Sequence, residues 1–279
     1  MPGFGFINGP VLVAGGAKNL FQAIGSLGQG TDLEAAWDVG AFSSWPGSGG
    51  LWRDLTGNAR HLFFGSSSGS DSNEAIFNGL VNSLSAAEYW RAQANDYFEE
   101  AQTMPWKNTM GVSTPFTIGA MVWMDGGASG FKSILFDSAA YNSGVNSYQG
   151  TEIAITGDAS NMQGMMRGVS YIAGNPSHIT KLTSILSAKY NQWVMIGVRF
   201  DKNDSGGAMM INTSEYSLSG TWFSATNKES ATRLWNDRVV NVNSGARLAW
   251  QFQAKRKWTA AEWQALYQEM RTNRFTSLP

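Results

Sequence analysis

One stretch of the sequence, Phe116-Thr-Ile-Gly-Ala-Met-Val-Trp-Met124, runs directly into the turn residues Asp125-Gly126-Gly127. Its side chains alternate in character, as they do in a β-strand, where successive side chains point to opposite faces of the sheet. Asp and Gly then supply the backbone freedom that a tight turn needs. The stretch therefore predicts a β-strand that ends in a turn.

The same pattern of short strands and turns recurs along the chain. Residues 201–207 are rich in Asp, Asn, Ser and Gly and precede the apolar residues 208–211, which predicts a hairpin. Further strands are predicted at residues 133–136, 152–156, 192–200 and 247–253. Strands do not alternate with helices, so an all-β antiparallel β-sandwich is favoured over a doubly wound α/β sheet.

Composition restricts the class of protein. Only 15% of the 279 residues are charged, 32 are Gly, and 12 Trp and 15 Phe supply much aromatic surface to bury, which argues against a disordered or helix-rich chain. The net charge of −1 gives no overall field to hold a nucleic acid. The absence of Cys excludes disulfides, thiolate metal sites and Cys nucleophiles. We expect a globular protein with no nucleic-acid partner.

One helix is clearly signalled. Thr259-Ala-Ala-Glu262 forms a capping box, and the apolar residues Trp263, Leu266, Tyr267 and Met270 then share one face. This predicts one short C-terminal helix near residues 259–272. Ser85-Ala-Ala-Glu88 has the same form, but paired strands at 88–93 and 96–99 are favoured there by the family resemblance described below, with a helix as the alternative.

Residues 1–30 differ from the rest and are treated as an apolar, Gly-rich N-terminal arm, which leaves 31–279 as the domain. The arm has too little continuous surface to fold alone and is too apolar to lie in water. It either packs on its own domain or docks on a neighbouring subunit. No Lys or Arg precedes Lys18, and the apolar stretch is short, so neither a signal peptide nor membrane insertion is expected. The docking residues would be Phe4, Phe6, Ile7, Val11, Val13, Leu20 and Phe21.

A series of motifs follows one order along the chain: LEAAWD at 33–38, SWPGSG at 44–49, LWRDLTGN at 51–58, YWRAQANDYF at 89–98, TPFTIGAMVW at 114–123, NQWVMIGVRFD at 191–201 and WTAAEWQALY at 258–267. In order and spacing they resemble the motifs of the LamG-like, concanavalin A-like domains that are common in bacteriophage and bacterial surface proteins. The resemblance covers about residues 31–271. One departure is that the family's F-D-G turn reads Ala92-Gln93-Ala94 here.

The resemblance implies two stacked antiparallel sheets with jelly-roll topology. It does not imply one function, because this fold serves lectins, glycosidases, adhesion modules and virion decoration alike. Function must therefore come from the site residues.

The search for catalytic groups finds no convincing set. Glucanases of this fold carry Glu-x-Asp-x-x-Glu, which brings two carboxylates together on one strand face, and no such run occurs. The Gly-x-Ser-x-Gly match at residues 65–69 lies in a Ser-rich loop and not between a strand and a helix. The only histidines are His61 and His178, and Glu99 and Glu100 point to opposite faces of a strand. The chain is predicted not to be an enzyme.

Metal and sugar sites are weaker expectations. Asp201, Asn203 and Ser205 imitate half of a calcium loop, but Asn212 replaces the Glu that such a loop requires, so the hairpin is favoured. The resemblance implies that a calcium ion could be held at the rim of the sandwich, and no other cofactor is expected; the candidate ligands are Asp38, Asp54 and Asp96.

Carbohydrate binding, the common small-ligand role of the family, needs an exposed aromatic platform. Five Trp residues lie in strand-like patterns and are expected in the core: Trp37, Trp52, Trp123, Trp193 and Trp250. Four others lie nearer turn residues and are the candidates for stacking on a sugar: Trp45, Trp106, Trp222 and Trp235.

Three functions compete. A non-enzymatic bacteriophage virion protein, either a head decoration or tail-associated, is favoured; its partners would be other virion proteins, copies of itself and host or particle glycans. It would be made in the host cytoplasm and located in the virion. A carbohydrate-binding adhesin of the bacterial surface is the first alternative, and a glycoside hydrolase of the same fold is the second, weakened by the missing carboxylate pair.

Overall fold

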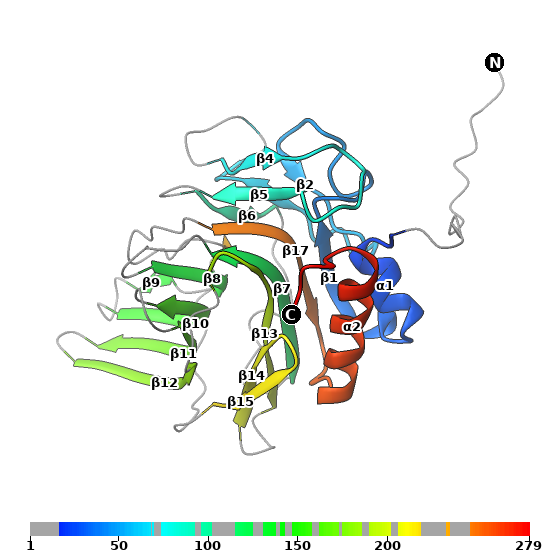
Figure 1. The fold of residues 1–279 in the computed structure, drawn as a ribbon. Coiled ribbons are helices and arrows are strands. Elements are labelled where there is room, and N and C mark those ends of the chain that lie inside the picture. The colour runs from blue at the N-terminus through cyan, green and yellow to red at the C-terminus, as the bar shows by residue number, and fades with distance from the viewer. Residues whose placement is uncertain are drawn as a thin grey trace.

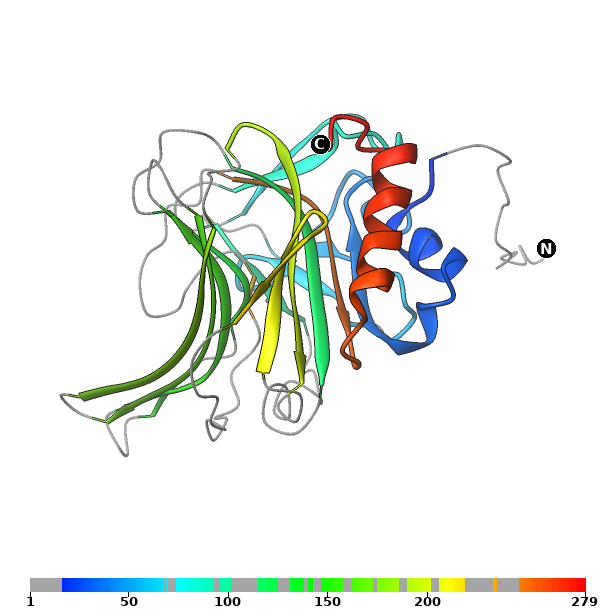
Figure 2. The same ribbon diagram turned by 60° about the horizontal axis from the view of Figure 1, so that its bottom comes forward.

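Two antiparallel β-sheets face each other, and two α-helices cover the outer face of one of them, so that the molecule has three layers (Figure 2). The computed structural model describes a set of ranges that excludes the first 16 residues and several internal segments. The described residues are 17–67, 69, 74–92, 96–101, 115–124, 131–137, 140–142, 147–157, 162–172, 175–185, 190–201, 206–218, 233–234 and 246–279. The predicted all-β antiparallel sandwich is confirmed.

The eight-stranded sheet lies in the middle of the molecule (Figure 1). In spatial order its strands are β15 (Ser214–Ser217), β14 (Gly206–Ile211), β13 (Trp193–Asp201), β7 (Phe116–Met124), β17 (Ala246–Ala254), β5 (Tyr89–Ala92) and β4 (Ile76–Asn78), with β1 (Leu33–Asp38) also paired to β17. The stretch Phe116–Met124, predicted to be a strand, is thus a central strand of this sheet. The predicted hairpin is confirmed, because β13 pairs with β14.

The second sheet has nine strands among the described residues. In spatial order they are β12 (Asn175–Ile185), β11 (Met162–Ile172), β10 (Ser147–Gly157), β8 (Phe131–Asp137), β16 (Arg233–Leu234), β6 (Phe98–Glu100), β3 (Leu62–Phe64) and β2 (Leu51–Trp52), with β9 (Ala140–Asn142) paired to β10.

The eight-stranded sheet is buried on both faces, which explains its apolar sequence. On β7, Ile118 and Val122 point into the core between the two sheets, whereas Met121 points into a second core beneath the helices. The helix layer lies very close to the sheet: a Cβ at Gly197 would lie 2.7 Å from the Trp263 ring. The same Cβ would collide still more closely with the Ile118 carbonyl oxygen of β7, so both the neighbouring strand and the helix require glycine at that position.

The predicted C-terminal helix is α2 (Ala260–Asn273), and it begins with the predicted capping box. Its predicted apolar face is buried against the eight-stranded sheet. By contrast, the alternative helix at 85–88 is wrong. The strands expected at 88–93 and 96–99 are present as β5 and β6, but their expected pairing is wrong, because β5 belongs to the eight-stranded sheet and β6 to the nine-stranded sheet. Both carboxylate oxygens of Glu88 accept backbone N–H groups, from Ser83 at 2.7 Å and Ser85 at 3.1 Å, and this closes a turn before β5.

A second helix, α1 (Leu20–Ser26), was not predicted. A short 3₁₀ turn, Gly30–Asp32, links it to β1. Leu20 and Ile24 are fully buried in the core beneath the helices, and Phe21 packs against that core. The hypothesis that Leu20 and Phe21 dock on a neighbouring subunit is therefore corrected, because both pack on their own domain. The other predicted docking residues lie outside the described part of the chain. No helix in the described ranges is long and apolar enough to cross a membrane.

Candidate functional site

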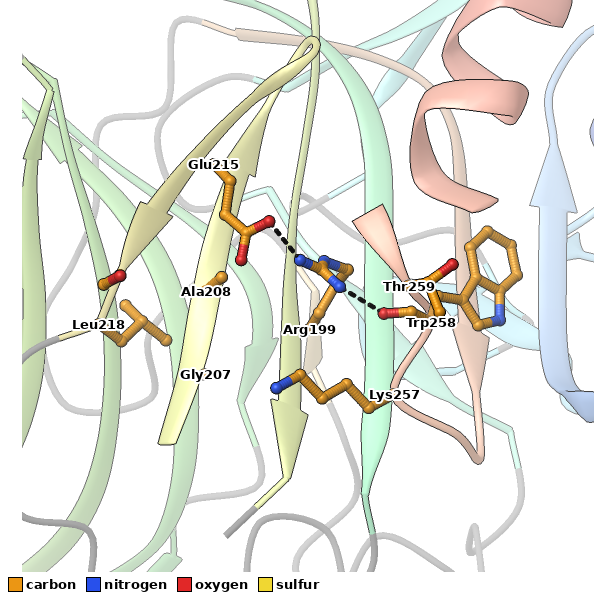
Figure 3. A pocket seen from close by; sticks show the side chains of 9 residues that line it. Arg199, Gly207, Ala208, Glu215, Leu218, Lys257, Trp258 and Thr259 are labelled. Carbon is orange, nitrogen blue, oxygen red and sulfur yellow. Dashed lines mark hydrogen bonds and ion pairs between the residues drawn. The ribbon is translucent and has the colours of Figure 1, made fainter. Parts of the chain in front are cut away.

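A polar pocket of about 500 Å³ opens beside the start of α2, at the edge of the eight-stranded sheet. Figure 3 shows Glu215 and Leu218 on one side, Lys257 and Trp258 on the other, and Arg199 between them. Gly207 and Ala208 of β14 form part of the wall, and Ser217 and Thr259 add hydroxyl groups. The pocket is thus built by three adjacent strands and the segment that leads into the helix.

Arg199 is the central side chain of this pocket. It lies on β13 and points to the helix side of the sheet, where only 4% of the residue is exposed. Its Nη1 donates to the carbonyl oxygen of Trp258 at 2.5 Å, and its Nη2 pairs with Glu215 at 2.6 Å. Nε is buried without a hydrogen-bond partner. Glu215 remains 44% exposed, so the ion pair has one buried and one solvated member.

The aromatic ring of Trp258 does not line the pocket as a stacking platform. Trp258 is fully buried and stacks on Phe252, with ring centroids 4.6 Å apart. Its backbone amide donates to the Thr117 hydroxyl at 2.8 Å, which fixes the segment beneath the pocket. Trp258 therefore contributes its carbonyl oxygen to Arg199 and holds the wall in place.

A charged cluster holds the start of α2 next to the pocket. The guanidinium of Arg256 makes two hydrogen bonds to Glu262, at 2.8 and 2.9 Å, and one to Asp32 at 2.7 Å. The hydrogen bonds from Arg256, together with those from Thr259, lower the pKa of Glu262 from 4.5 to about 2, against the opposing effect of burial. The same contact to Glu262 raises the pKa of Arg256 above its ordinary value. The helix start is therefore held by ionised groups at neutral pH.

The pocket lining is polar and carries both signs of charge. Glu215 is the one carboxylate among the lining residues and is paired with Arg199, so the lining does not offer the pair of carboxyl groups, about 5–10 Å apart, that many glycosidases use. The volume falls within the usual range of small-ligand sites, roughly 300–1,000 Å³. Hydroxyl, carboxylate and cationic groups together can both donate to and accept from a polyhydroxylated ring.

The predicted sugar platform is not formed by Trp45. Only 6% of Trp45 is exposed, and its ring packs at 4.8 Å from that of Trp90 and 5.1 Å from that of Phe64. Trp45 belongs to the core between the sheets because the SWPGSG turn folds it inward. The other three candidates, Trp106, Trp222 and Trp235, lie outside the described residues. Of the predicted core residues Trp37, Trp52, Trp193 and Trp250 are buried and Trp123 is half-buried.

The predicted calcium ligands are used in other ways. Both oxygens of Asp38 bond to Arg274 Nη1, at 2.8 and 2.7 Å, with neither side chain exposed. Asp54 accepts backbone N–H groups from Ala36, Thr56 and Arg60. Asp96 is buried at the start of β6. Within the described ranges no three acidic or histidine side chains gather to hold a metal ion.

The motifs that carry the family resemblance therefore build the fold. Asp54 and Asn58 of LWRDLTGN fix a loop against β1: Asn58 Nδ2 donates to the carbonyl oxygens of Leu33 and Glu34. Ser44 of SWPGSG accepts from the Asp38 amide and donates to the Arg53 carbonyl. None of these residues lines the pocket.

The comparisons with known proteins concern the fold. No protein-family model matches the chain, and no curated protein sequence matches it. Similar structures include the binding domain of Paraclostridial Mosquitocidal Protein 1 (TM-score 0.57, 15% identity, 85% of this chain and 52% of that chain). They also include the binding domain of botulinum neurotoxin serotype D (0.58, 8%, 88% and 52%) and Trypanosoma rangeli sialidase in complex with sialic acid (0.54, 12%, 85% and 33%).

These likenesses define the class of protein. The chain is a β-sandwich with a lectin-like fold, and it spans about half the length of the toxin domains and a third of the sialidase. At 8–15% identity the likeness shows the fold alone.

Proposed function

We propose that this chain is a non-catalytic glycan-binding module of a bacteriophage virion, and that it holds one sugar residue in the Arg199 pocket. The observation that carries the binding role is the pocket itself, in which Arg199, Glu215, Ser217 and Lys257 present polar groups of both signs around a volume of about 500 Å³. The structural neighbours support a binding role in general, since they include binding domains of toxins.

The charge of the pocket favours an acidic sugar over a neutral one. Lys257 adds a second cationic side chain to a lining in which Arg199 and the single carboxylate of Glu215 already form an ion pair. Charge-assisted hydrogen bonds are roughly twice as strong as neutral ones, so a sugar carboxylate would gain most from this lining. We expect acidic glycans to be retained more strongly than neutral glycans of the same size, and more weakly as salt increases.

A glycan array with the full chain tests the binding role. The variant Ser217→Trp fills the pocket from the exposed side of β15, whereas Ser214→Trp places the same ring on the opposite face of the same strand and serves as the matched control. We expect Ser217→Trp to lose at least tenfold in affinity and Ser214→Trp to bind like the unaltered chain. An array without any bound glycan, or equal binding by both variants, would contradict the proposal.

The virion role rests on the collinear motifs that resemble those of phage proteins, and the non-catalytic role on the single paired carboxylate of the pocket. A gene that lies among capsid and tail genes supports the first, and its presence among genes for secreted proteins would favour the adhesin. Incubation with glycosides that bind on the array should release no sugar. Release that Glu215→Gln abolishes would show a glycosidase instead.

A further inference from the structure

An apolar patch lies on two loops at one end of the eight-stranded sheet, and this end is remote from the pocket. In the described part of the chain four large hydrophobic residues are exposed, and three of them are Phe42 at 56%, Leu80 at 76% and Val81 at 38%. Phe42 belongs to the loop after β1, and the other two to the loop after β4. Together these three residues are called the loop patch.

The two loops that form the loop patch are in contact. The Phe42 amide donates to Oδ1 of Asn82 at 3.3 Å. Gly47, at a positive φ of 90°, lies so close to the second loop that a Cβ there would be 2.8 Å from Val81 Cγ2. The two loops that carry the three exposed apolar side chains are therefore held against each other.

The first described residues of the chain lie beside the same loops. The Leu20 amide donates to Oδ2 of Asp38 at 2.7 Å, and the Gly40 amide donates to Oδ1 of the same carboxylate at 2.9 Å. Phe42 follows two residues later. One carboxylate thus joins the start of α1 to the loop that carries Phe42.

The sequence before α1 is apolar, and few residues separate it from the first described residue of the chain. It carries Phe4, Phe6, Ile7, Val11 and Val13, and Val13 lies only four positions before Ala17, a span of about 14 Å at most. The loop patch exposes apolar surface, and the neighbouring segment is too apolar to remain in water, so each can bury the apolar surface of the other. We infer that residues 4–13 cover the loop patch of their own chain.

The same chain is the favoured source of the covering segment for two reasons. Its next residues already pack in this way, since Leu20 and Ile24 are fully buried in the core of their own domain. A segment tethered by so few residues also has a millimolar effective concentration at the loop patch, which a second copy does not reach in dilute solution.

Cross-linking tests this inference cleanly because the chain contains no cysteine. The double variant Asn8→Cys/Ser43→Cys places one thiol in the segment and one beside Phe42, at an exposed residue. The control Asn8→Cys/Gln264→Cys moves the second thiol to an exposed residue on the first turns of α2. With a short bismaleimide we expect an intramolecular product for the first pair, at a yield independent of protein concentration, and at least fivefold less of it for the control.

A second measurement does not depend on the introduced thiols. Deleting residues 2–16 keeps α1 and should uncover the loop patch, so that the fluorescence of an added apolar dye rises several-fold. Leu80→Ser in the deleted chain should reverse most of that rise, and it cannot disturb the core because Leu80 is 76% exposed.

Three results would overturn the inference. Covalent dimers whose yield grows with concentration would mean that the segment covers the loop patch of a second copy. Equal cross-linking in the two double variants would mean that the segment has no preferred position. Dye fluorescence that does not change on deletion would mean that the loop patch was never covered.

Discussion

At the scale of single residues, buried polar side chains divide into two groups. Both carboxylate oxygens of Asp54 accept hydrogen bonds, from the backbone amides of Ala36, Thr56 and Arg60 and from the Thr56 hydroxyl. Gln253, on β17, is fully buried, and neither of its amide atoms has a hydrogen-bond partner. Its register partners are Ala35 and Ile118, which offer only apolar side chains.

The unsatisfied amide of Gln253 predicts a stabilising substitution. A buried polar group without a partner costs about 1–3 kcal/mol, and each kcal/mol shifts the thermal midpoint by about 2–4 °C in a chain of this size, so Gln253→Met should raise the midpoint by at least about 2 °C. Scanning calorimetry measures the shift. The control Asn58→Leu removes two satisfied hydrogen bonds and should lower the midpoint. A lower midpoint for Gln253→Met would show that a buried water bonds to the amide.

At the scale of elements, the helix start beside the pocket depends on ionisation. The pKa of Glu262 is lowered to about 2, so its contribution to stability is complete above its ordinary value of 4.5 and is lost as pH falls towards 2. Glu262→Gln should therefore be less stable at pH 7, and its stability should fall less between pH 4.5 and 2. Urea unfolding across this range measures both, and the two proteins should converge near pH 2.

That prediction fails if the two curves run parallel down to pH 2. Parallel curves would mean that the pair of Glu262 with Arg256 adds nothing that depends on charge.

The sequence predicts best those elements whose pattern is long or is supported by more than one feature. The predicted strands at 192–200 and 247–253 became β13 and β17, and the Thr259 box became the start of α2. Helix α1 was missed because it is only seven residues long, although Asn19 and Gln22 form a capping box that could have signalled it.

The pocket could not be found in the sequence because its parts are far apart in the chain. Arg199, Glu215 and Lys257 belong to three segments that become neighbours only through the pairing of β13, β14 and β15 and the docking of α2. One local signal did exist: Arg199 is a charged residue in an otherwise apolar strand. The Trp45 candidate was wrong for a different reason, since proximity to turn residues does not decide exposure.

At the scale of the whole molecule, one buried ion pair joins residues 236 positions apart. Asp38 at the end of β1 and Arg274 after α2 are both fully buried, and the Arg274 Nε also donates to the Ser85 carbonyl at 3.4 Å. This contact ties the first strand, the loop before β5 and the C-terminal helix together.

Breaking this ion pair should lower the stability strongly, and replacing both partners should lower it by less than the sum of the two single losses. Asp38→Asn and Arg274→Met should each lose about 3–5 kcal/mol of stability, because each leaves a buried charge unpaired, while the double variant should lose clearly less than their sum. Urea unfolding of the four proteins gives the coupling. Lys18→Ala, which breaks the partly exposed pair with Glu269, should cost about 0–1 kcal/mol. Additive losses at Asp38 and Arg274 would contradict the assignment.

Because β1 pairs with β17, β1 cannot take its place in the sheet during synthesis until β17 has been translated. Leu33 pairs with Ala254 and Asp38 with Trp250, and β17 also lies between β7 and β5. The first strand to leave the ribosome must therefore wait for more than two hundred further residues before it meets its partner. Such distant pairing is slow and leaves apolar strand edges open meanwhile. We therefore expect a nascent chain of this protein to expose the unpaired edge of β1 until β17 has been translated.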